Sequence, residues 1–115
     1  MAFRNRVKFT TATTGTGSVT VGAASSGFQT PASSGVADGE IVNYAIEDGA
    51  AWETGVSQAS STATVFTRVL EQSSTAALLN LTGSAVMFFT PTAAKLGQMS
   101  VRGKMLQLSI GNVLQ

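Results

Sequence analysis

The sequence predicts an all-β protein, a small antiparallel β sandwich or barrel with extended terminal arms. Three observations support this fold class. Short runs rich in β-branched and aromatic residues recur along the chain, and Gly, Ser, Asp or Pro separate them roughly every 8–12 residues. Several runs alternate polar and apolar side chains, as strands with one buried face do. No apolar stripe with helical spacing reaches a useful length.

The chain has 115 residues, which is enough for one domain. We expect an N-terminal arm over residues 1–9, a β domain over 10–96 and a C-terminal strand or arm over 97–115. The last part includes residues 105–110, where apolar and polar side chains alternate well. This alternation indicates a final strand that could pair with a neighbouring subunit.

The first part of the β domain contains short strands and one long loop. Residues 10–17 are rich in Thr and end in Gly15-Thr16-Gly17, which indicates a strand followed by a tight turn. Residues 18–21 alternate and predict a short, half-buried strand. Residues 22–39 are dense in Gly, Ala and Ser, with Phe28 as the one large anchor, and predict a loop.

A β-hairpin is the clearest element. Residues 40–47 place three large apolar side chains on one face, Asp48-Gly49 indicates a turn, and residues 51–56 begin the returning strand. Trp52 lies in that strand, so we expect its ring to pack against the apolar face as a core residue.

The second half of the β domain predicts three further strands, over residues 63–70, 77–81 and 86–90. Bulky residues are consecutive at Met87-Phe88-Phe89 and must point to both faces of their strand. We therefore expect burial on both sides, between two sheets or at a subunit interface. After Pro91, residues 92–96 could form one helical turn.

The composition excludes most catalytic machinery. There is no His and no Cys, so Ser/His/Asp and Cys/His nucleophiles, disulfides and thiolate metal sites are impossible. Only 11% of the residues are charged. We expect no enzyme activity, no catalytic residue, no cofactor and no metal. A hydrolase using a carboxylate pair from the acidic middle of the chain remains a minor alternative.

Charge is unevenly distributed although the net charge is only +1. Basic residues gather near both ends, and we expect these to contact partner proteins: Arg4, Arg6, Lys8, Arg102 and Lys104. They make no extended basic face, so nucleic acid is not an expected partner. Low charge and positive mean hydropathy favour a homo-oligomer, with a trimer preferred.

No segment indicates a membrane protein. The longest strongly apolar run, residues 85–89, is far shorter than the roughly 20 residues that span a bilayer. No apolar stretch follows the basic residues near the N-terminus, so a signal peptide is not expected.

The order of several short segments resembles a small β module of tailed-phage virion proteins. This module is described as similar to the first catalytic cysteine half-domain of ubiquitin-activating enzyme. The similarity covers roughly residues 3–94. It rests on Phe3-Arg4-Asn5-Arg6-Val7-Lys8, Thr13-Thr14-Gly15-Thr16-Gly17, Phe28, Gly39, Tyr44-Ala45-Ile46, Trp52-Glu53-Thr54-Gly55, Thr67-Arg68-Val69-Leu70-Glu71-Gln72-Ser73-Ser74 and Val86-Met87-Phe88-Phe89-Thr90.

The resemblance implies a bacteriophage virion structural protein, made in the host cytoplasm and located in the virion. It implies no ubiquitin chemistry, because the chain has no cysteine. A short stand-alone module fits a head decoration or cement protein, or a fibre-base protein, that binds capsid or tail subunits. The alternative is a tail-fibre or host-adhesion module that binds cell-surface carbohydrate through Tyr44 or Trp52 at a loop rim.

Overall fold

The computed structural model describes residues 3–94 and residue 96, and the predicted C-terminal strand lies outside them. These residues confirm the all-β class. Nine strands form within the described part of the chain: β1 Lys8–Thr11, β2 Thr14–Gly15, β3 Val19–Thr20, β4 Ile41–Asp48, β5 Ala51–Ser60, β6 Val65–Phe66, β7 Val69–Ser73, β8 Leu81–Thr82 and β9 Ala85–Phe89.

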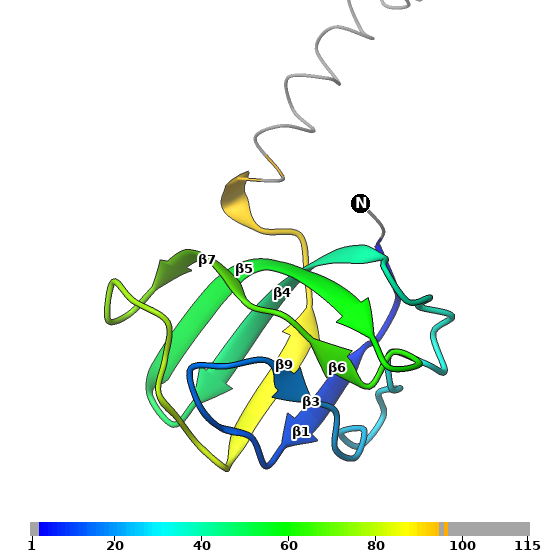
Figure 1. Cartoon of the computed structure of the whole chain (residues 1–115), viewed down its shortest axis with the longest axis horizontal. Coiled ribbons are helices and arrows are strands. Elements are labelled where there is room, and N and C mark those ends of the chain that lie inside the picture. The colour runs from blue at the N-terminus through cyan, green and yellow to red at the C-terminus, as the bar shows by residue number, and fades with distance from the viewer. Residues whose placement is uncertain (1–2, 95, 97–115) are drawn as a thin grey trace, which may run out of the picture.

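One antiparallel sheet dominates the molecule (Figure 1). Its strand order is β1-β9-β4-β5-β6-β3, and β7 also pairs with β5. Strand β5 is long enough to pair with both, β7 along its first half and β6 at its end. Strands β2 and β8 form a separate two-stranded ladder. The main sheet curls into a half-barrel, so its concave face encloses the core.

The two ends of the curled sheet are joined by the chain that follows β3. Thr10 in β1 donates its N–H to the carbonyl of Ala23 and accepts the N–H of Gly22, both at 2.9 Å. A Cβ on Gly22 would lie 2.5 Å from the Thr10 carbonyl oxygen, so only glycine allows this approach. Backbone hydrogen bonds therefore continue past the end of the sheet.

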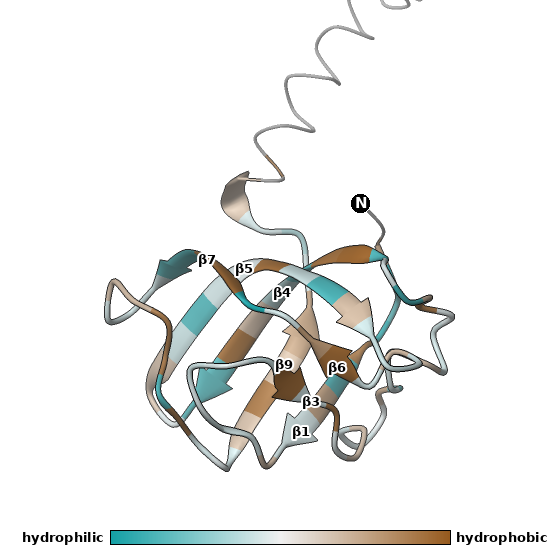
Figure 2. Cartoon of the chain, viewed as in Figure 1, coloured by the Kyte–Doolittle hydropathy of each residue, from teal (hydrophilic) through white to brown (hydrophobic). Residues whose placement is uncertain are grey.

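The core lies inside the curl. The rings of Phe9, Phe66 and Phe89 pack with centroids 5.4–6.4 Å apart, which joins β1, β6 and β9. Apolar residues concentrate on strands β3, β6 and β9 (Figure 2). Buried apolar side chains of β3, β4, β8 and β9 complete the cluster: Val19, Val42, Tyr44, Ile46, Leu81 and Met87.

The predicted hairpin is confirmed, but the predicted position of Trp52 is wrong. Strands β4 and β5 pair from Ile41↔Gln58 to Asp48↔Ala51. This register sets Trp52 opposite Glu47, so both side chains lie on the convex, outer face of the sheet. Trp52 is 38% exposed. The inward position beside it belongs to Glu53, which is fully buried.

The N-terminal segment is more tightly integrated than an arm over residues 1–9 implies. Strand β1 begins at Lys8, and the side chains of Val7 and Phe9 are buried in the core. Their apolar side chains face inward while Lys8 faces outward, as the alternation of a strand requires. Residues 7–9 therefore belong to the β body.

The later strands differ in detail from the prediction. The segment 63–70 divides into β6 and β7, and residues 77–80 form no strand before the short β8. Strand β9 matches its prediction closely. Its inward residue Met87 is fully buried, whereas the outward Val86 and Phe88 are only partly buried. Burial of this strand is thus full at Ala85 and Met87 on the inward face and partial on the outward face.

Candidate functional site

A buried ion pair occupies the centre of the sheet's concave face. The Glu53 carboxylate accepts hydrogen bonds from Arg68 Nε at 2.9 Å and Nη2 at 2.6 Å. It also accepts the Tyr44 hydroxyl at 2.6 Å and the backbone N–H of Leu79 at 2.9 Å. The side chains of Glu53 and Arg68 are 0% and 1% exposed. Four donors thus saturate the two carboxylate oxygens.

The remaining donors of Arg68 fix loops from distant parts of the sequence. Its Nη1 donates to the carbonyls of Gly15 and Gly17 at 3.1 and 3.2 Å, and its Nη2 also donates to Leu79 at 2.7 Å. All five guanidinium N–H groups therefore have acceptors. The arrangement connects the loop after β2, the segment before β8 and strand β5. Its geometry is that of a structural clamp.

The clamp determines the protonation states of its members. Burial raises the pKa of Glu53, but hydrogen bonds from Arg68 and Tyr44 outweigh it, so the pKa lies below its ordinary value of 4.5. Burial, followed by the hydrogen bond to Glu53, raises the pKa of Tyr44. Tyr44 is fully buried with its hydroxyl committed to Glu53, which corrects the expectation that it could contact a sugar.

Four more carboxylates bind the chain's own groups, so five of the six acidic side chains serve the fold. Glu47 is the exception, because within the described part of the chain its carboxylate accepts no hydrogen bond and forms no ion pair. Each of the four connects separate segments: Glu40 to Arg4, Asp38 to the backbone of Thr62 and Ala63, Asp48 to Thr82, and Glu71 to Thr92 and Ala94.

Of the three predicted partner-binding residues that the structure describes, Arg6 and Lys8 meet on the outer face and Arg4 does not. Arg4 forms an ion pair with Glu40. Arg6 has a left-handed backbone (φ 56°), and the side chains of Arg6 and Lys8 both lie against the Phe28 ring. Arg102 and Lys104 lie outside the described residues.

A groove forms where Arg6 and Lys8 meet aromatic side chains. Its volume is about 310 Å³, and its lining residues are Arg6, Val7, Lys8, Phe28, Glu47, Phe88 and Phe89. The Arg6 guanidinium carbon lies 4.0 Å from the centroid of the Phe28 ring. The Lys8 ammonium lies 5.3 Å from Phe28 and 5.8 Å from Phe88. These distances are typical of cation–π contacts.

Sequence reasoning identified the cations of this groove but missed its aromatic walls. Phe88 stands directly opposite Lys8 in the β1–β9 register, and Phe28 comes from the long loop. The alternation of β9 contained a signal for Phe88, because Phe88 must face away from the buried Met87. Nothing in the loop sequence indicated where Phe28 would lie.

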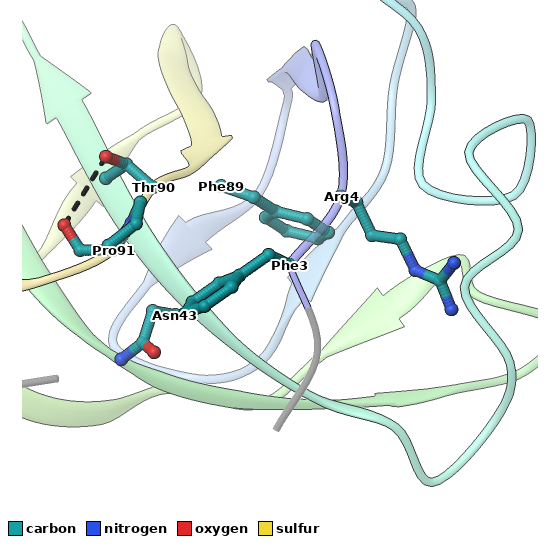
Figure 3. Close-up of a pocket in the computed structure, with 6 residues that line it drawn as sticks. All are labelled: Phe3, Arg4, Asn43, Phe89, Thr90 and Pro91. Carbon is teal, nitrogen blue, oxygen red and sulfur yellow. Dashed lines mark hydrogen bonds between the residues drawn. The ribbon is translucent and has the colours of Figure 1, made fainter. Parts of the chain in front are cut away.

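A second, smaller cavity lies where the chain leaves β9 (Figure 3). Phe3 and Phe89 both line it, and the Arg4 side chain points away from them. The volume is about 30 Å³, enough for a single water molecule. Asn43 lines it, and its buried Oδ1 has no hydrogen-bond partner among the described residues. This cavity is too small for an organic ligand.

The chain matches no family model, no curated protein and no solved structure. Within residues 3–94 and 96, no group of three or more Asp or Glu side chains is placed to hold a metal ion. The same residues contain no helix long and apolar enough to cross a membrane. The groove and the exposed Trp52 are two surface features of the described residues that support a functional argument.

Proposed function

We propose that this chain is a non-enzymatic bacteriophage virion structural protein. It would be a small accessory subunit on the particle surface, a head decoration or cement protein or a fibre-base protein, that binds capsid or tail subunits. The phage assignment rests on the sequence resemblance over residues 3–94. The non-enzymatic role is supported by the carboxylates, since five of six hold the fold together.

The observation that carries the binding role is the groove at Arg6 and Lys8. No carboxylate of the described residues lies within ion-pair distance of either cation. Both lie against aromatic side chains on the outer face, where a neighbouring subunit has access. Aromatic residues and Arg are enriched at protein interfaces, which favours this surface as a contact with a neighbouring subunit.

Mass spectrometry and cryo-electron microscopy of purified particles test this function. We expect the chain in the particles in stoichiometric amounts, with ordered density on the head or at the base of a fibre. Its absence from particles that package DNA normally would refute the proposal. Density at one location would also distinguish decoration from a fibre-base role.

The proposed subunit forms a homo-oligomer, with a trimer preferred. Sedimentation at micromolar concentration should show a species about three times the 11.8 kDa monomer mass. A single 11.8 kDa species at all concentrations would contradict self-association.

Trp52 supports a second candidate, a host-adhesion module that binds cell-surface carbohydrate. Its ring is 38% exposed on the outer face beside the unpaired Glu47, and an exposed ring beside a polar group can stack on a sugar. Under this alternative, Trp52→Ala reduces adsorption of particles to host cells and lowers stability by only about 1–2 kcal/mol. Wild-type adsorption by the variant would rule out the adhesion role.

A further inference from the structure

The groove defined by Arg6, Lys8, Phe28, Glu47 and Phe88 holds an excess of positive charge. Two cations line it against one carboxylate, and that carboxylate forms no ion pair with either. Every other acidic side chain of the protein is engaged elsewhere. Apart from Glu47, the described residues therefore offer no anion to neutralise the groove.

The walls of the groove are fixed before any partner arrives. Lys8 and Phe88 stand opposite each other on two paired strands. The loop that carries Phe28 is bound to the N-terminal segment, since Gln29 donates its N–H to the Arg6 carbonyl at 2.8 Å. Arg6 Nη2 donates to the Gly27 carbonyl at 2.9 Å. A preorganised groove loses little conformational entropy on binding.

We propose that this groove binds an acidic segment of a partner protein. The partner's carboxylate would lie between the Arg6 guanidinium and the Lys8 ammonium, and a neighbouring apolar side chain would contact the rings of Phe28 and Phe88. This inference deepens and rests on the proposed function, because it names the chemistry by which the subunit recognises its neighbour. The two cations select a carboxylate, and the rings of Phe28 and Phe88 select an apolar side chain next to it.

The groove suits a carboxylate side chain better than a nucleic acid. Its volume of about 310 Å³ is at the lower limit of ligand sites, so it accepts one or two side chains. A nucleic acid presents a row of phosphates and requires a row of cations. Here only two cations gather, and Glu47 beside them would repel the next phosphate.

Two model peptides test the proposal directly. Acetyl-Leu-Glu-Leu-amide supplies a carboxylate between apolar side chains, and acetyl-Leu-Gln-Leu-amide is its neutral match. Titrations followed by two-dimensional NMR should show the Glu peptide binding about fivefold more tightly, with the largest shifts at Lys8, Phe28 and Phe88. The difference should shrink in 0.5 M salt, because exposed charges are screened. Equal binding of the two peptides would overturn the inference.

Opposite changes of groove charge provide the sharper test. Lys8→Gln should weaken binding of the Glu peptide several-fold, and Lys8→Arg should retain it. Glu47→Gln removes the repelling carboxylate and should tighten binding. Both side chains lie on the surface, so wild-type spectra elsewhere in the protein serve as the control for folding. If both Gln variants change affinity in the same direction, electrostatic recognition in the groove is refuted.

A ten-nucleotide thymidine oligomer tests whether the groove binds nucleic acid instead of an acidic protein segment. Tighter binding of this oligomer than of the Glu peptide, with shifts at the same groove, would overturn the proposal in favour of a nucleic-acid surface. Incorporation into particles combined with indifference to both peptides would refute this inference alone. Peptide binding by a protein that is absent from particles would refute the proposed virion role alone.

Discussion

At the scale of single residues, the stability of this protein depends on Glu53 and Arg68. Two opposite charges lie among buried side chains that are otherwise uncharged. Removing charges from water costs several kcal/mol each, and only complete hydrogen bonding offsets that cost. Every donor and acceptor of the pair is satisfied, so the pair tolerates its burial.

We predict that Glu53→Gln lowers the free energy of unfolding by about 3–5 kcal/mol, because it leaves the buried Arg68 charge without a counterion. Urea denaturation followed by fluorescence measures the change. The matched control is Glu47→Gln, the same chemical change at an exposed carboxylate, which should cost less than about 0.5 kcal/mol. Equal losses of unfolding free energy for the two substitutions would show that the Glu53–Arg68 pair does not stabilise the fold.

The pKa shifts predict a pH window for stability. The pKa of Glu53 is lower in the folded protein than its ordinary value of 4.5, so its contribution is complete above that value. The contribution is lost as the pH falls through the folded-state pKa. The pKa of Glu40, lowered by the hydrogen bond from Arg4, acts in the same direction. Urea midpoints should therefore drop between pH 6 and pH 3, and a constant midpoint would contradict the shifts.

At the scale of elements, the junction of β5 and β7 sets the shape of the sheet. The register shifts between Thr54 and Gly55, which is a β-bulge. The missing side chain at Gly55 lets the β7 backbone and the Tyr44 hydroxyl approach closely. The bulge therefore allows β5 to pair with β7 while the Glu53 side chain stays on the concave face of the sheet.

We predict that Gly55→Ala destabilises the protein by about 3 kcal/mol, since overpacking a closed site carries a cost of this order. The added Cβ would lie 2.1 Å from the Val69 carbonyl oxygen and 2.8 Å from the Tyr44 hydroxyl. Gly17→Ala is the control, because nothing lies within 4 Å of its added methyl group. Thermal melts measure the melting temperature of both variants against the wild type. An unchanged melting temperature for Gly55→Ala would refute the close packing around Gly55.

Elements with strong local patterns were predictable from the sequence. The hairpin of β4 and β5 carries its alternation and its Asp48-Gly49 turn in consecutive residues, and β9 is a compact apolar run. Trp52 was misplaced because a one-residue choice of register decides which face a side chain takes. Local sequence contains no such information, since the deciding partner, Glu53, finds Arg68 only in the folded sheet.

At the scale of the whole molecule, the N-terminal segment completes the curled sheet. Val7 and Phe9 fill the core, and Thr10 joins the end of the sheet to the chain after β3. We predict that deleting residues 1–9 unfolds the protein, whereas deleting residues 97–115 preserves the fold, because the buried core cluster lies within residues 7–87. Circular dichroism of the two truncations measures this. A folded protein lacking residues 1–9 would show that the segment is a dispensable arm.

The candidate groove was only partly predictable, because it joins four separate segments of the chain. The basic residues near the N-terminus were visible in the sequence, and two of them do line the groove. Phe28 reaches these residues because backbone hydrogen bonds hold its loop against the N-terminal segment. The composition of the loop does not predict this placement. A binding surface assembled from long-range contacts becomes visible only after the chain has folded.

The buried ion pair also restricts how this gene can change over time. Losing Glu53 or Arg68 alone would remove a large share of the roughly 5–15 kcal/mol that holds a typical domain folded. A lineage that replaces one residue must pass through a barely folded intermediate before it replaces the other. The two positions should therefore be inherited as one unit, so that descendants keep both charges or replace both with apolar residues.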